Sequence, residues 1–105
     1  MLGIGTWEFP VHIMGYKGTV QIVITDNGGR YGFTLRVPGR EQHIPPVKIM
    51  RLAENGNTLN IIARVPQFPG KDIPVSVTFN GDSANGMMKA PFVGIIKLYN
   101  GRKIA

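Results

Sequence analysis

Apolar and polar residues alternate in short runs along most of this chain. In one run, Val20, Ile22 and Ile24 are separated by single residues, a period of two that places all three side chains on one face of a β-strand. Glycines and prolines recur between the runs, as is typical of short strands joined by frequent turns. The pattern predicts eight strands, over residues 5–14, 18–25, 30–37, 44–53, 58–65, 73–79, 84–90 and 94–100.

Eight short strands with short connections predict an all-β fold, an up-and-down antiparallel sheet. Such a sheet hides its edges by closing into a barrel. Prolines at 45–46 and 66 interrupt the places where an amphipathic helix might begin, so we expect little or no helix. The length of 105 residues predicts a single barrel domain over 1–105.

The connections between the predicted strands are of two kinds. Three are tight polar turns: "DNGG" (26–29), "ENGN" (54–57) and "NGDS" (80–83). The alternate four carry aromatic residues and prolines: "MGYKG" (14–18), "PGREQH" (38–43), "PQFPGKD" (66–72) and "APFVG" (90–94). Alternate connections lie at opposite ends of an up-and-down barrel, so we expect a ligand to bind at the loop-rich end. The alternative is that these aromatic residues simply plug the barrel.

The candidate ligand-binding residues come mainly from this loop-rich end. They are Tyr16, Lys17, Arg40, His43, Phe68, Lys71 and Phe92. Lys48 joins them because a two-residue turn at Asn55-Gly56 would pair it with Ala63 and point it inward. A buried ammonium needs an anionic partner, which favours a ligand with a carboxylate or phosphate group. Alternatively, Lys48 extends out through the open end, or a bulge at Pro45-Pro46 turns it outward.

The same registers predict which other side chains face inward. Trp7, Phe9, Val11 and Ile13 form one inner row. Turns at Asn27-Gly28 and Gly81-Asp82 add the pairs Ile24–Tyr31, Ile22–Phe33, Val20–Leu35, Phe79–Ala84, Val77–Gly86 and Val75–Met88, and the turn at Asn55-Gly56 adds Leu52–Leu59 and Met50–Ile61. Val47, Ile49 and Ile62 are left on the outer face. They indicate either a homodimer contact or incidental surface apolar residues.

The composition offers little for catalysis or metal binding. There is no cysteine, and the two histidines lack the partners that a zinc site needs. Glu8 and His12 share a strand face but lie about 13 Å apart, too far for direct acid–base cooperation. We expect no metal and no cofactor, and a binding protein rather than an enzyme. The enzyme alternative is a small isomerase or cyclase that uses Lys48 or His43.

The net charge is +6, but the basic residues are scattered and form no run. A basic nucleic-acid-binding or assembly module with a solid core remains a further alternative. It is disfavoured for nucleic acid because Phe9, Tyr31, Phe33 and Phe79 are predicted inside, not on a face where bases could stack. No leader or membrane-spanning segment is apparent, so we expect a cytoplasmic protein without a membrane span.

The G-x-W motif of Gly5-Thr6-Trp7 opens the first strand, and Arg102 follows the last strand at the same end. In this the chain resembles small bacterial lipocalin-like barrels of the calycin superfamily. The resemblance implies that Arg102 stacks on Trp7 at the base of the barrel. It also implies that the longer loops ring the opening to an apolar or amphipathic anionic ligand. The chain differs from a typical lipocalin in its short length and in lacking the long helix after the last strand.

Overall fold

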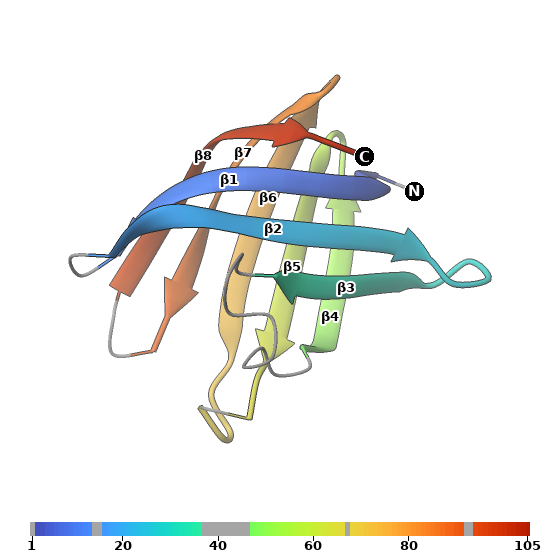
Figure 1. Cartoon of the computed structure of the whole chain (residues 1–105). Helices are drawn as coiled ribbons and strands as arrows, with labels where there is room; N and C mark the ends of the chain where they lie inside the picture. The colour runs from blue at the N-terminus through green and yellow to red at the C-terminus, as the bar shows by residue number, and fades with distance from the viewer. Residues whose placement is uncertain (1, 14–15, 37–46, 67, 92–93) are drawn as a thin grey trace.

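A computed structural model describes residues 2–13, 16–36, 47–66, 68–91 and 94–105 (Figure 1). The eight strands are β1 (Gly5–Ile13), β2 (Tyr16–Asp26), β3 (Tyr31–Arg36), β4 (Lys48–Asn55), β5 (Thr58–Arg64), β6 (Ile73–Asn80), β7 (Ser83–Ala90) and β8 (Gly94–Lys103). No helix occurs in these ranges. The predicted all-β class and the number of strands are confirmed.

The strands form one antiparallel sheet in the order β3-β2-β1-β8-β7-β6-β5-β4. Every strand pairs with its neighbour in the chain except β3 and β4, while β1 and β8 pair across the two ends of the chain. The sheet curls so that β1, β2 and β3 cross over β4 to β7 (Figure 1). The result is the predicted up-and-down barrel, nearly closed, with its open seam between β3 and β4.

The N-terminal segment covers the base of the barrel. The indole Nε1 of Trp7 donates a hydrogen bond to the carbonyl oxygen of Gly3 at 2.8 Å, and the indole ring lies 4.8 Å from the ring of Phe79. Gly3 has a φ of +69°, and a Cβ there would overlap the Phe79 ring. Only glycine fits both the backbone conformation and the close approach. Trp7 therefore fixes the segment that closes the base.

Arg102 does not stack on Trp7, so that expectation is wrong. Its side chain is 73% exposed and forms an ion pair with Glu8, with 3.5 Å between Nη2 and Oε1. The cause is a bulge in β8, where Asn100 has a φ of 58° and its backbone N–H donates to the Asn85 side chain. A one-residue shift in a strand reverses its faces. Beyond the bulge Arg102 faces outward.

Gly101 takes the inward position that the bulge creates. It is buried, and a Cβ on it would overlap the ring of Phe9 and approach the carbonyl oxygen of Ala84. Phe9, which is 1% exposed, packs directly on this backbone. The β1–β8 closure thus depends on a residue without a side chain at this point.

Two of the three predicted hairpins keep their expected faces. The β6–β7 register is confirmed, with Val75 paired to Met88 and Phe79 to Ala84. In the β2–β3 hairpin Asp26 pairs with Tyr31, so the turn has four residues and the register is displaced by two. A displacement of two leaves each side chain on its predicted face. The inner row of Trp7, Phe9 and Val11 is also confirmed; the side chain of Ile13 lies outside the described residues.

The β4–β5 hairpin corrects several predictions. Asn55 pairs with Thr58, and a bulge falls at Met50 between the paired residues Ile49 and Arg51. Met50 is 40% exposed, and Lys48 is also exposed, so neither faces inward as expected. Val47 and Ile49 are half-buried and pack against the core. The outer apolar patch predicted for a homodimer therefore loses two of its three members, Ile62 alone remaining.

One side-chain interaction spans the open seam. The phenol of Tyr31, at the start of β3, donates a hydrogen bond to the Glu54 carboxylate near the end of β4. The same oxygen accepts a hydrogen bond of 2.6 Å from the backbone N–H of Leu2. Burial, followed by the hydrogen bond to Glu54, raises the pKa of Tyr31 above its usual value. Tyr31 thus joins β3, β4 and the N-terminal segment at the base.

We expect Tyr31→Phe to lower the free energy of unfolding by about 1–2 kcal/mol, because Leu2 and Glu54 both lose their partner. Urea denaturation measures the change. The matched control is Tyr99→Phe, whose hydroxyl takes part in no hydrogen bond among the described residues; it should change stability by less than about 0.5 kcal/mol. Equal effects of the two substitutions would contradict the role of Tyr31.

The raised pKa of Tyr31 also predicts a dependence on pH. The folded protein holds the phenol proton more tightly than the unfolded chain does, so this stabilisation is complete below pH 10 and is lost as the pH rises through the raised pKa. Unfolding free energies measured between pH 9 and pH 11 should therefore decline less steeply in Tyr31→Phe than in the wild type. Parallel curves would show that another group is responsible.

Candidate functional site

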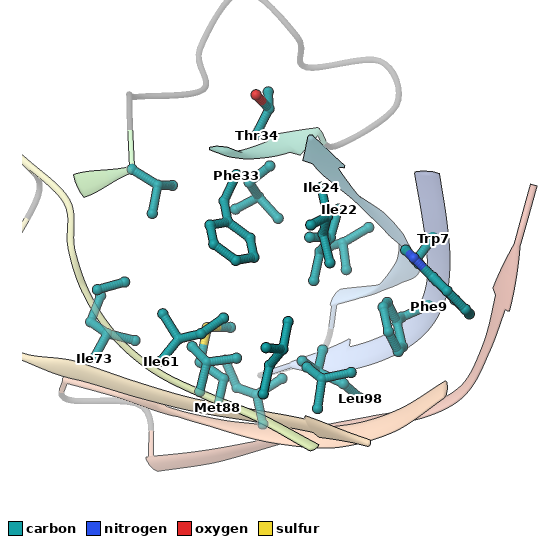
Figure 2. Close-up of a pocket in the computed structure, with 18 of the residues that line it drawn as sticks. Trp7, Phe9, Ile22, Ile24, Phe33, Thr34, Ile61, Ile73, Met88 and Leu98 are labelled. Carbon is teal, nitrogen blue, oxygen red and sulfur yellow. The ribbon is translucent and has the colours of Figure 1, made fainter. Parts of the chain in front are cut away.

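The interior of the barrel is not completely filled. A cavity of about 310 Å³ lies between the β1–β3 layer and the β4–β8 layer. Figure 2 shows Phe33 pointing from β3 into this space, with Ile61 and Met88 on the opposite layer and Trp7 and Phe9 at one side. The volume is about ten times the share of one water molecule in the liquid. It lies at the small end of the range for ligand pockets.

The described lining of this cavity is almost wholly apolar. Its members come from all strands and are mainly valine, isoleucine, leucine and phenylalanine. The hydroxyl of Thr34 points away from the cavity (Figure 2), and the indole N–H of Trp7 is already bonded to Gly3. No ionisable side chain is among the described residues that line the cavity. Apolar cavities of this kind stay dry and accept apolar molecules, because water finds no hydrogen-bonding partners there.

The seam between β3 and β4 explains why the cavity exists. Phe33 and Leu35 on β3 face Val47 and Ile49 from the other layer across strands that share no backbone hydrogen bonds. Hydrogen-bonded strands lie about 4.8 Å apart. Because β3 and β4 are not held at that spacing, the side chains of the two layers need not interdigitate between them. The four lining residues at this seam are only half-buried although they face inward, so the cavity extends to the free edge of β3.

The structure does not bring the predicted ligand-binding residues together at this cavity. Lys17 lies on β2 instead of in a loop, because Ile13 pairs with Tyr16 and the β1–β2 connection is only two residues long. Lys48 and Lys71 are exposed, and Phe68 is half-buried in a turn; none of these lines the cavity. Arg40, His43, Phe92 and the side chain of Tyr16 lie outside the described residues.

Trp7, predicted on the inner row and at the base of the barrel, also lines the cavity. The alternation of apolar and polar residues along the strands correctly predicted that most of the lining residues face the core. It gave no sign that they leave a space, because the separation of β3 from β4 is a property of the closed sheet. The predicted connection at 38–43 is no longer than the one at 66–72, so its length gives no signal of the separation either.

Polar chemistry is sparse in the part of the chain that the structure describes. No group of three or more His, Asp or Glu side chains is arranged to hold a metal ion there. Glu8 is engaged by Gln21 and Arg102, as its predicted position on the outer face allows. Among the described helices and strands, no helix is long and apolar enough to cross a membrane.

No known protein-family model matches this chain, and no curated protein matches its sequence. Among solved structures, the fold is similar to that of a secretary abundant heat soluble (SAHS) protein from Ramazzottius varieornatus, crystallised from a dimer sample. The TM-score is 0.65 at 18% sequence identity, over 97% of this chain and 94% of that chain. At this level of identity the likeness shows a shared small-barrel architecture, and it extends along the whole length of both chains.

Because of the bulge at Met50, introducing an aspartate should destabilise the protein much more at Ile49, which faces the cavity, than at Met50, which faces solvent. Ile49→Asp should lower the free energy of unfolding by about 2–4 kcal/mol, because a carboxylate would enter the apolar cavity without a partner. Met50→Asp places the same group in solvent and should cost less than about 1 kcal/mol. Thermal and urea denaturation measure both changes. The reverse order would mean that β4 runs without the bulge.

Proposed function

We propose that this protein binds a small apolar molecule, or the apolar part of an amphipathic one, inside the barrel. The observation that carries the proposal is the cavity of about 310 Å³ with an apolar lining that reaches the edge of β3. Each methylene transferred from water into such a space gains about 0.8 kcal/mol. A chain of roughly ten heavy atoms matches the available volume.

The character of the lining restricts the ligand. The described lining is apolar and gives no counter-charge to a carboxylate or phosphate. A charged group would lose its hydration without compensation, so any anionic head must remain outside the cavity. The proposal thus retains the apolar part of the ligand predicted from the sequence, but it places the charged group of that ligand outside the cavity.

The cavity also favours binding over the other functions considered from the sequence. Its described lining presents no acid, base or nucleophile to the interior, and an isomerase or cyclase would need such groups. A structural module with a solid core would not need the space. Binding by an apolar interior requires only the shape and chemistry that these strands supply.

The test uses Trp7, the single tryptophan of the chain, as a fluorescent reporter in the cavity wall. We expect 1-decanol, an uncharged probe, to change the Trp7 emission in a saturable way. The variant Ala63→Leu extends a buried lining residue into the cavity and should weaken the apparent affinity at least tenfold, because it occupies the ligand's space.

Ala53→Leu is the matched control, since it makes the same change at an exposed position of β4. It should leave the affinity within twofold of the wild type. Circular dichroism confirms that both variants are folded. Equal weakening in both variants, or no saturable change in the wild type, would refute binding in the cavity.

A further inference from the structure

A second concavity lies on the outer surface of the barrel, where β2, β1 and β8 are neighbours. It is a groove of about 640 Å³. Its walls include Pro10 and His12 from β1, Lys17 and Thr19 from β2, and alternate residues of β8. Val11 lines both this groove and the interior cavity.

The groove arises where β1 and β8 stop pairing. Their register consists of Trp7 with Lys103 and Glu8 with Arg102, and it ends there. Pro10 has no backbone N–H to donate to a neighbouring strand. On the other side, the bulge at Asn100 interrupts the regular course of β8. Backbone chemistry on both strands therefore keeps the groove open.

Basic side chains gather in this groove from three strands. His12 and Lys17 are paired residues of β1 and β2 and share the outer face, and Lys97 adds an ammonium from β8. Neither lysine makes an ion pair with any residue in the described ranges. No Asp or Glu is among the described residues that line the groove. The nearest acid along β1, Glu8, is already bound to Arg102 and Gln21.

Apolar surface lies beside these cations. Ile95 is 64% exposed and Tyr99 46% exposed, both on the outer face of β8 and both in the groove. The Lys97 ammonium lies 5.8 Å from the centre of the Tyr99 ring, which holds it over the aromatic face. Lys89, exposed on β7 opposite Ile95, adds a further positive charge next to the apolar surface.

We propose that the β1–β2–β8 groove binds a free amphipathic anion, with its phosphate or carboxylate between Lys17 and Lys97 and its apolar part on Ile95 and Tyr99. Two ammonium groups, neither paired with a carboxylate among the described residues, supply charge-assisted hydrogen bonds to an anion. Ile95 and Tyr99 gain from losing contact with water. The site is distinct from the interior cavity and does not depend on ligand binding there.

The experiment compares three probes by NMR titration of the ¹⁵N-labelled protein: decyl phosphate below its micelle concentration, 1-decanol and inorganic phosphate. We expect decyl phosphate to shift the amides of His12, residues 17–19, Ile95, Lys97 and Tyr99, which line the groove and not the cavity, with a saturable curve. Inorganic phosphate should bind the same residues at least tenfold more weakly, because it lacks the apolar part. 1-Decanol should leave these amides unmoved, since it lacks the charge.

The double variant Lys17→Gln/Lys97→Gln should weaken decyl phosphate binding at least tenfold. Lys48→Gln/Lys71→Gln removes the same charge from two exposed lysines outside the groove and should change binding less than twofold. Equal losses would mean that net charge alone attracts the anion, and a larger loss in the second pair would place the head at the loop-rich end. Either result overturns the proposal.

Two further outcomes separate the groove from other sites. Shifts confined to interior residues such as Phe33 and Leu98 would support the cavity and refute the groove. Sedimentation with vesicles containing an anionic phospholipid, without saturable binding of monomeric decyl phosphate, would make the groove a membrane contact and refute a site for a free amphiphile. Failure of 1-decanol to alter Trp7 fluorescence bears on the cavity alone.

Discussion

The unpaired seam between β3 and β4 is the constraint on which the rest of this structure depends. The sheet is continuous from β3 through β1 and β8 to β4, so closure across the chain ends leaves the seam in the middle of the sequence. Tyr31 ties its base end to Glu54 and to the N-terminal segment. The layers are thus joined at the base and remain apart further along, where the apolar cavity lies.

The strands of the barrel wall present chemically different surfaces to the interior and to the exterior. Inward positions of the strands form a cavity without charge, and outward positions of β1, β2 and β8 form a basic groove with exposed apolar residues. Val11 belongs to both surfaces. This division follows from the period of two in a strand, because neighbouring residues of one strand face opposite environments. An amphipathic ligand would find apolar partners on either side of the wall, but charged partners only outside.

Much of the fold was predictable because it is encoded locally. Turn residues fixed the β6–β7 register, and in the β2–β3 hairpin an error of two residues left every face unchanged. The wrong facing predictions, over residues 47–50 and at Arg102, share one cause. These residues lie at or beyond a one-residue bulge, at Met50 and Asn100 respectively, and a shift of one residue exchanges the inner and outer faces. The bulge at Met50 has no turn signal, whereas Asn100-Gly101 is an Asn-Gly pair that favours the positive φ found there.

The sequence by itself determined that this protein is a barrel of eight antiparallel strands with an apolar interior and tight turns at its base. The alternation of apolar and polar residues and the identity of the turn residues each act over a few positions, and together they are sufficient to predict this architecture. Only the tertiary structure decided where the barrel stays open and which cations converge. The seam depends on how the whole sheet closes, and the row of His12, Lys17 and Lys97 depends on pairing between strands far apart in the chain. Such non-local geometry is absent from the local pattern, which is why the interior cavity and the outer groove emerged only from the folded chain.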